Sequence, residues 1–373
     1  MRLDDDERLA RLCLLRGPGI GPVRYRALFA HFGSAREALK GSRAAWCGLG
    51  VPERSCAALE KPDWSGAERD LAWANQAGRH LLFLDEADYP PLLAACDDAP
   101  IRLFVDGDVS LLQRHQIAMV GSRNPTAGGR DNAFEFARHL AGMGLVIASG
   151  LALGIDAAAH EGCLAAGPTL AVTGHGPDRI YPAQNRVLAE RIRERGAIVT
   201  EYPLGAAAIA RHFPQRNRII SGLSLGVLVV EAAMRSGSLI TARLAMEQGR
   251  EVFALPGSIH NPLARGCHRL IRDGAKLVET AEDILEELGS LALHATTAAT
   301  LTPSVAQASP DEPDAEYGVL LKALGHDPVG VDRLVERTGL TPDAVSSMLL
   351  LLELQGHVAA LGGGRYARLA RPA

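Results

Sequence analysis

QIAMVGSRNPTAGGRDNAFEFARHLAGMGLVIASG, residues 116–150, contains the unit from which most of this chain is built. A short apolar run, QIAMVGS (116–122), passes through a glycine-containing turn into a helical pattern, and a second apolar run, LVIASG (145–150), follows. Two parallel strands need a crossover between them, usually a helix, and a parallel sheet is normally covered on both faces. This stretch therefore predicts a strand–helix–strand unit of an α/β domain.

The same alternation continues on both sides of this unit. Short runs rich in β-branched residues occur at LLFLD (81–85), TLAVTGH (169–175), AIVTEYP (197–203), LGVLVVEAA (225–233) and EVFALPG (251–257). Helical stretches such as NRVLAERIRERG stand between most of them. The pattern predicts a doubly wound, mostly parallel sheet covered by helices, and we expect this domain to span residues 76–290.

The region before residue 76 has a different character. From Glu7 to about Leu59 the pattern is helical and rich in alanine, and GPGIGP (17–22) forces a tight turn between two helices. We expect a small helical domain over residues 1–75. Its turn is either a plain connection between helices or the hairpin of a helix-hairpin-helix or SAM-like module, whose backbone amides can contact a DNA phosphate.

The sequence pattern of the C-terminal part predicts a linker followed by a winged helix. The segment LALHATTAATLTPSVAQASPDEPDA is rich in Ala, Thr, Ser and Pro and has no apolar period, so we expect a linker over residues 291–313. Residues 314–373 then follow the order helix, helix, turn, helix, hairpin, with Thr341 as an N-cap and Pro342 in the first helical position. That order is typical of a winged-helix domain.

Composition limits the classes of function. The 373 residues are 47% hydrophobic and 22% charged, an ordinary globular composition with enough chain for two or three domains. The net charge is −4, so a polyanion would have to be attracted by a local patch. The six cysteines form no CxxC and no paired spacing, which indicates reduced thiols and no metal site or disulfide framework. An acidic N-terminus and the lack of a membrane-length apolar run predict a cytoplasmic protein with no membrane partner.

Candidate binding residues follow the predicted strands. Open α/β sheets bind ligands at the carboxyl ends of their strands, where glycine and free helix amides admit a phosphate. Three small or glycine-rich turns, GSRNPTAGG, SGLALGID and EAAMRSGSLITA, supply the candidates Gly121, Ser122, Ser149, Gly150, Ser236, Gly237 and Ser238. Tight turns and close helix packing are the alternative use of such glycines. Neither a GxGxxG nor a P-loop pattern is present, so no nucleotide cofactor is expected.

Positive charge gathers in HFPQRNRIISGLS (212–224), where Arg216 and Arg218 flank Asn217 in front of an apolar run. Arg123 stands directly after a predicted strand. A guanidinium matches the geometry of a phosphate and stays charged in most surroundings, so these arginines are candidate phosphate ligands. The alternative is an ion pair with one of two nearby carboxylates, Glu201 or Glu231.

An aromatic residue stands within the same cluster. Phe213 is flanked by His212 and lies close to Arg211 and Arg216 in the sequence. An exposed aromatic ring beside arginines can stack on a nucleic-acid base, whereas a buried one would only pack in the core. Phe213 and Arg211 are therefore also candidates for contact with DNA.

Long motifs occur here in a fixed order: VGSRNPT (120–126), SGLALGIDAAAH (149–160), DRIYPAQN (178–185), EYPLG (201–205), FPQRNRIISGLS (213–224), EAAMRSGSLITARLA (231–245) and LPGSIHNPLARGCHRLIRDGAKL (255–277). With the preceding DEADYPPLLAACDDAPIRLFVDGD (85–108), this series resembles the DNA-processing protein A family, also called DprA or Smf. The resemblance covers most of the chain. It implies an extended Rossmann-type domain that binds and protects single-stranded DNA and helps to load the RecA recombinase in natural transformation. It also implies a homodimer without catalytic activity.

The resemblance also implies a set of contact residues. The arginine of the GSR motif and the residues around FPQRNR would form the strand-binding pocket, which here means Arg123, Phe213, Arg216, Asn217 and Arg218. Asn185 and Arg186, after the YP turn, would reach the DNA backbone as well. The chain departs from the family pattern at three positions, Pro177, Ala183 and His268, so less positive charge is expected on that side of the pocket.

Two other classes of function compete with this reading. A nucleotide phosphoribohydrolase would need a catalytic glutamate about one turn after its glycine-rich loop, but the first carboxylate after Gly237 is Glu247, nearly three turns along a helix. No catalytic residues are therefore predicted. The winged helix could instead be the main DNA reader, but its candidate recognition helix, PDAVSSMLLLLELQ, contains no Lys or Arg. Leucine-rich helices of this kind more often pack or bind protein.

Overall fold

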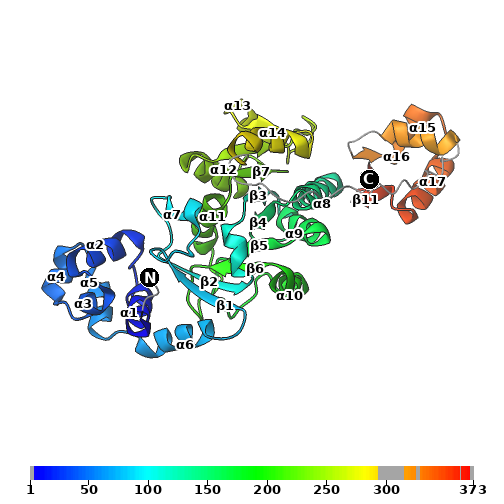
Figure 1. Cartoon of the computed structure of the whole chain (residues 1–373). Helices are drawn as coiled ribbons and strands as arrows, with labels where there is room; N and C mark the ends of the chain where they lie inside the picture. The colour runs from blue at the N-terminus through cyan, green and yellow to red at the C-terminus, as the bar shows by residue number, and fades with distance from the viewer. Residues whose placement is uncertain (1–3, 293–314, 325–327, 362, 370–373) are drawn as a thin grey trace.

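A computed structural model describes residues 4–292, 315–324, 328–361 and 363–369. It consists of a helical N-terminal part, a large sheet with helices on both faces, and a small C-terminal unit (Figure 1). Most of the linker predicted for residues 291–313 lies outside the described residues, and its first two positions belong to the helix α14.

The N-terminal part is helical, as the alanine-rich pattern predicts. Its helices are α1 (Asp5–Arg16), α2 (Pro22–Phe32), α3 (Ala35–Leu39), α4 (Arg43–Gly48), α5 (Glu53–Glu60) and α6 (Trp64–Ala74). Asp4 caps α1 by accepting a hydrogen bond from the amide of Glu7. The predicted tight turn joins α1 to α2, where Gly19 takes a φ of 77° that favours glycine and Pro22 occupies the first turn of the next helix.

The main sheet has nine strands in the order β1-β2-β6-β5-β4-β3-β7-β8-β9. They are β1 (Arg79–Phe83), β2 (Arg102–Gly107), β3 (Gln116–Val120), β4 (Val146–Ser149), β5 (Thr169–Val172), β6 (Ala197–Thr200), β7 (Gly226–Val229), β8 (Glu251–Ala254) and β9 (Lys276–Leu277). Strands β3 to β9 pair in parallel, and β1 and β2 add an antiparallel edge. The sheet is therefore doubly wound and mostly parallel, as predicted, with β2 and β9 as strands that the apolar pattern missed.

Helices cover both faces of this sheet (Figure 1). They are α7 (Pro91–Ala94), α8 (Ala127–Gly142), α9 (Ile155–Ala166), α10 (Arg186–Arg195), α11 (His212–Leu223), α12 (Ser238–Glu247), α13 (Arg265–Arg272) and α14 (Ala281–Ala292), with 3-10 turns at η1 (Val109–Gln113) and η2 (Ala183–Asn185).

The buried side chains of β3 explain why the predicted strands read as continuous apolar runs. Ile117 and Met119 pack with residues of α8, α9 and α14, whereas Ala118 and Val120 pack with residues of α11 and α12. Both faces of the strand are therefore buried, which removes the polar alternation expected of a half-exposed strand. The chain leaves β3 toward β4 on one side and returns at β7 on the other, so the strand order reverses between β3 and β7.

The C-terminal unit is a winged helix, as predicted. Its elements are α15 (Ala315–Leu324), β10 (Val329–Gly330), α16 (Val331–Thr338), α17 (Pro342–Leu354), β11 (Val358–Leu361) and β12 (Arg365–Arg368). The three strands form a sheet in the order β10-β12-β11. Thr341 caps α17 by accepting a hydrogen bond from the amide of Ala344, and Pro342 begins that helix.

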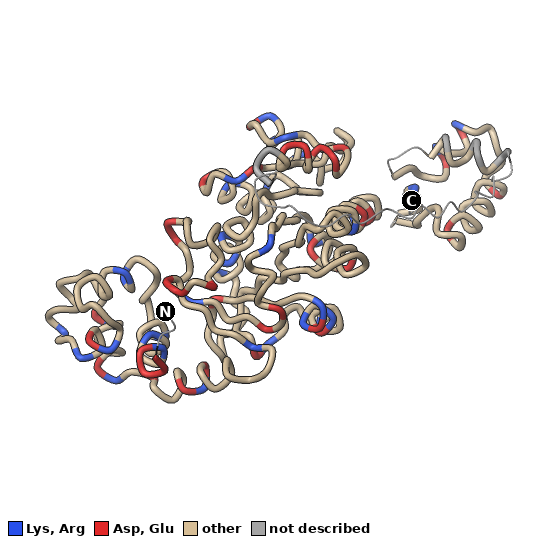
Figure 2. The backbone as a smooth tube through the Cα atoms, viewed as in Figure 1, with Lys and Arg blue, Asp and Glu red and all other residues tan. Residues whose placement is uncertain are grey.

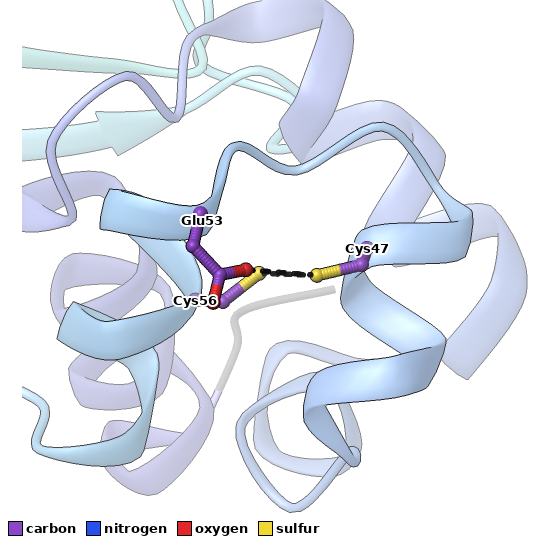
Figure 3. A group of neighbouring side chains, drawn as sticks. All are labelled: Cys47, Glu53 and Cys56. Carbon is purple, nitrogen blue, oxygen red and sulfur yellow. Dashed lines mark hydrogen bonds between the residues drawn. The ribbon is translucent and has the colours of Figure 1, made fainter.

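Two cysteines that the spacing rule treated as unrelated meet in space (Figure 3). The Sγ atoms of Cys47 at the end of α4 and Cys56 in α5 are 3.4 Å apart, and the carboxylate of Glu53 lies beside them. All six cysteines are free thiols. Among the described residues, no helix is long and apolar enough to cross a membrane.

Candidate nucleic-acid interface

A cavity of about 610 Å³ opens at the carboxyl ends of β3 and β7, beside the point where the strand order reverses. Ligands of open α/β sheets bind at this kind of position. The predicted contact residues that line this strand-end cavity are Gly121, Arg123, Phe213, Arg216, Asn217, Ser236, Gly237 and Ser238. Three segments that are distant in sequence thus converge here: the turn after β3, the first half of α11 and the start of α12.

Arg216 is the most unusual of these residues because it is buried without hydrogen-bond partners for two of its donors. The residue is 4% exposed, and its Nε and Nη1 atoms find no partner among the described residues. Burial lowers the pKa of Arg216 to about 10, although the nearby Asp156 opposes that shift. The side chain is therefore still cationic at neutral pH, and it faces a cavity with unused donors. Buried polar groups are normally paired, so this guanidinium is suited to hold an anion.

Gly150 makes room for this arginine. A Cβ atom built on Gly150 would come within 1.6 Å of Nη1 of Arg216. The amide of Gly150 donates a 3.1 Å hydrogen bond to the carboxylate of Asp156, which also accepts one from the amide of Ala152. Gly150 thus helps to position Arg216 and does not itself line the cavity, whereas Ala152 of the same turn does.

Arg123 and two aromatic rings form one wall. The guanidinium carbon of Arg123 lies 5.7 Å from the centre of the Phe213 ring, and the Tyr181 ring centre is 5.7 Å from that of Phe213. Tyr181 is 49% exposed, and no acidic side chain pairs with Arg123 in the part of the chain that the structure describes. A cation beside accessible aromatic faces can hold a phosphate and stack a base at once.

The beginning of α12 forms another part of the lining. Ser236 and Ser238 share a hydrogen bond of 2.6 Å between their hydroxyls, and Asn217 reaches from α11 toward the carbonyl of Gly237 at 3.5 Å. The helix has no side-chain cap at its N-terminus. The amides of Ser238, Leu239 and Ile240 already donate to Ser236 and Gly237, so it is the positive end of the helix dipole that favours a negative ligand here.

Arg218 lies on the other side of α11 and forms an ion pair with Glu201, which the sequence analysis gives as the alternative to a phosphate contact. Its Nη2 atom is 2.5 Å from Oε2 of Glu201, and both side chains are largely buried. Burial raises the pKa of Glu201, and the attraction of Arg218 opposes that shift. Arg218 and the neighbouring Arg211 do not line the strand-end cavity; both line a second cavity.

Several other predicted contacts have structural partners or lie elsewhere. Ser149 is buried and donates to the carbonyl of Met119, and Asn185 donates to the carbonyls after β4. The hydroxyl of Ser122 accepts a hydrogen bond from the amide of Asn124. Arg186 lines a separate hollow beside α10. These residues shape or surround the strand-end cavity without lining it.

Asp156 and Tyr181 also line this cavity and are not among the contact residues predicted from the sequence. Both stand inside the motifs SGLALGID and DRIYPAQN. Their spacing from the arginines carries no signal, because loops of different strands bring them together.

The carboxylates near this site have structural partners. Glu231, two residues after β7, accepts hydrogen bonds from the amide and hydroxyl of Thr126, the N-cap of α8. Glu247, the residue considered for catalysis, ends α12 and is absent from the lining of the strand-end cavity. Among the described residues this cavity therefore contains one carboxylate, that of Asp156, and it is held by backbone amides.

Comparison with known proteins supplies independent findings. A family model described as DNA recombination-mediator protein A matches residues 80–289, and models of a DprA winged helix domain and a DprA-like N-terminal HHH domain match residues 304–364 and 5–41. Protein Smf of Escherichia coli K12 is 46% identical over 308 residues, which cover 82% of this chain and 81% of that protein. DNA processing protein DprA of Bacillus subtilis 168 is 44% identical over 59% of this chain and 75% of its own length.

Two solved structures are also similar. DNA processing protein A from Streptococcus pneumoniae superposes with a TM-score of 0.67 at 34% identity and covers 77% of this chain and 99% of its own. A structure of DNA processing protein A from Helicobacter pylori, which describes the single-stranded DNA binding mode of that protein, has a TM-score of 0.52 at 31% identity and covers 57% of this chain and 96% of its own. The fold, the order of motifs and the matched models agree, and the chain belongs to the DprA/Smf family of DNA recombination-mediator proteins.

Proposed function

We propose that the strand-end cavity binds single-stranded DNA and that the protein acts as a non-catalytic recombination mediator in the cytoplasm. The observation that carries this proposal is Arg216, a buried cation whose Nε and Nη1 donors lack partners among the described residues. A phosphodiester supplies the acceptors that these two donors lack.

The remaining walls favour a single strand over a duplex. Phe213 and Tyr181 offer ring faces, and unpaired bases are free to stack on them. Arginines would contact the backbone, which carries no sequence information, so the binding is expected to have little sequence preference. The described strand-binding mode of the relative from Helicobacter pylori supports the same ligand.

Family membership supports a wider role. We propose that the protein protects incoming strands, helps to load RecA onto them in natural transformation, and works as a homodimer. Sedimentation equilibrium of the full chain tests the dimer, and a RecA filament-nucleation assay on coated single strands tests the loading step. A monomer at micromolar concentration, or no acceleration of RecA nucleation, contradicts these parts of the proposal.

Binding itself is tested by titrating the full chain with single-stranded and duplex oligonucleotides of equal length over a salt series. Single-strand affinity should fall linearly with salt on a double-logarithmic plot, because each phosphate contact releases counterions. Equal affinity for the duplex, or an affinity that does not depend on salt, contradicts the proposal.

A further inference from the structure

A second cavity, of about 720 Å³, lies between the N-terminal helices and the edge of the sheet. One wall is the turn between α1 and α2, residues 17–22, together with Arg24 and Arg54. The other wall consists of Arg102 on β2, Glu201 after β6 and the first turns of α11. Because the α1–α2 turn forms one side, we refer to this space as the hairpin cavity.

The lining of the hairpin cavity has an excess of positive charge. Five arginines line it, Arg24, Arg54, Arg102, Arg211 and Arg218, whereas its carboxylates are Asp98 and Glu201. Both carboxylates pair with Arg218. Within the described residues, the other four arginines form no ion pair. The chain as a whole has a net charge of −4, and charges of both signs are interspersed along it (Figure 2). The positive charge at this cavity is therefore local and uncompensated.

Arg102 resembles Arg216 in having an unused buried donor. The residue is 5% exposed, its Nε atom donates to the carbonyl of Glu201 at 3.2 Å, and its Nη1 atom finds no partner among the described residues. Its guanidinium carbon rests 5.5 Å from the centre of the Phe104 ring. The side chain is thus fixed on one side by the protein and borders the hairpin cavity with a donor to spare.

The α1–α2 turn holds a second fixed cation. Nη1 of Arg24 donates to the carbonyl of Gly19 at 2.6 Å, and its Nε donates to the carbonyl of Gly50 at 3.2 Å. The hydroxyl of Ser55 donates to the carbonyl of Pro18, which ties the turn to α5. The turn and its arginine are therefore preorganised, which lowers the entropy cost of binding.

Helix α11 connects the two cavities. Arg211, Gln215 and Arg218 face the hairpin cavity, while Phe213, Arg216 and Asn217 face the strand-end cavity. This division follows from the helical period, because residues three and four apart share a face. The N-terminal turn of α11, with its positive dipole end, thus stands between two cation-lined spaces.

We propose that the hairpin cavity binds the sugar-phosphate backbone of the same single strand, so that one continuous site crosses the N-terminal turn of α11 onto the α1–α2 hairpin. The inference rests on the proposed function of the strand-end cavity. A chain of regularly spaced phosphates fits two neighbouring cation-lined cavities better than two separate small anions do. The consequence is a binding site that needs a longer strand than the strand-end cavity alone can cover.

The test compares two oligo(dT) lengths on full-length variants. A strand of about 6 nucleotides is short enough for one cavity, and one of about 20 nucleotides can span both. Arg54→Ala and Arg211→Ala remove charge from opposite walls of the hairpin cavity. Arg69→Ala is the matched control, because Arg69 lies on α6, contacts Ser65 and does not line either cavity.

We expect Arg54→Ala and Arg211→Ala each to weaken binding of the long strand by roughly fourfold near physiological salt, because each loses the counterion release of one phosphate contact. The double variant should weaken binding by more than tenfold. Binding of the short strand and the behaviour of Arg69→Ala should not change. Thermal unfolding of each variant shows whether it is folded, and Arg211→Ala tests the idea independently if Arg54→Ala disturbs the helical part.

Each other outcome has a distinct meaning. If the long strand is bound equally well by all variants, the inference is wrong while the proposed function stands. Equal losses for both lengths overturn it too, since the arginines would then belong to the strand-end cavity. A loss confined to duplex DNA means that the hairpin cavity serves duplexes instead. If the unaltered protein binds neither strand, the proposed function itself fails.

Discussion

Two arginines two residues apart, Arg216 and Arg218, have opposite environments. The first is buried beside the strand-end cavity with unused donors, and the second is bound to Glu201. The sequence predicts both as phosphate ligands and leaves an ion pair open as the alternative. It cannot separate them, because residues two positions apart in a helix point to nearly opposite sides and the pattern does not reveal which side faces the ligand.

Arg218→Ala tests the ion-pair assignment. The substitution leaves the buried Glu201 without its cation, which costs roughly 3 kcal/mol of folding free energy. Burial raises the folded-state pKa of Glu201, and losing Arg218 raises it further, so the destabilisation should grow as pH rises above that pKa and shrink as pH falls below it. Thermal unfolding from pH 5 to pH 8 measures this. An unchanged unfolding temperature at pH 8 contradicts the assignment.

Phe213→Ala tests the stacking face. The ring lies beside Tyr181 and Arg123 at the strand-end cavity, so its loss should cost about 1–3 kcal/mol of single-strand binding free energy. Stacking is not ionic, so the salt dependence should stay nearly constant. Fluorescence anisotropy over a salt series provides both values, with Phe213→Tyr as the control that keeps a ring. A loss of salt dependence without loss of affinity would argue against stacking.

At the scale of elements, the positions of most strands and turns could be predicted from the sequence. Which turns line the cavity and which position other residues could not. Apolar runs located seven strands, because both faces of a parallel sheet are buried. The apolar pattern missed β2, which lies within the longer motif of residues 85–108. It also missed β9, because that strand has only two residues. The spacing of Cys47 and Cys56 in the sequence does not predict their contact. The two side chains belong to different helices, and only the packing of those helices brings them together.

Gly150→Ala tests how the turn after β4 works. Its Cβ atom would fall within 1.6 Å of Nη1 of Arg216, so the guanidinium must move out of its site. We expect single-strand affinity to fall at least tenfold while the sheet remains folded. Gly128→Ala is the control, because a Cβ atom there meets nothing within 4 Å. Unchanged affinity in Gly150→Ala would show that the position of Arg216 does not matter for binding.

At the scale of the whole molecule, the winged helix differs from the rest in its surface. Helix α17 lacks Lys and Arg and exposes Leu350, Leu351 and Leu354, which suits contact with protein better than contact with DNA. Deletion of residues 295–373 should therefore leave most single-strand affinity intact at near-physiological salt. Titration of the full-length and truncated proteins measures this. A tenfold loss without loss of oligomeric state would assign the main DNA-binding role to the winged helix.

We propose above all that Arg216, a buried cation with unpaired donors at the carboxyl ends of the strands, binds single-stranded DNA. Arg216→Met keeps the volume of that side chain and removes its charge, and Arg243→Ala removes an exposed charge of α12 that pairs with Glu247. Affinity for a labelled single strand, measured on both variants and the unaltered protein at several salt concentrations, tests the claim most directly. We expect Arg216→Met to weaken binding at least tenfold and to flatten the salt slope by about 0.7, whereas Arg243→Ala should change neither. Full affinity and an unchanged slope in a folded Arg216→Met protein would contradict it.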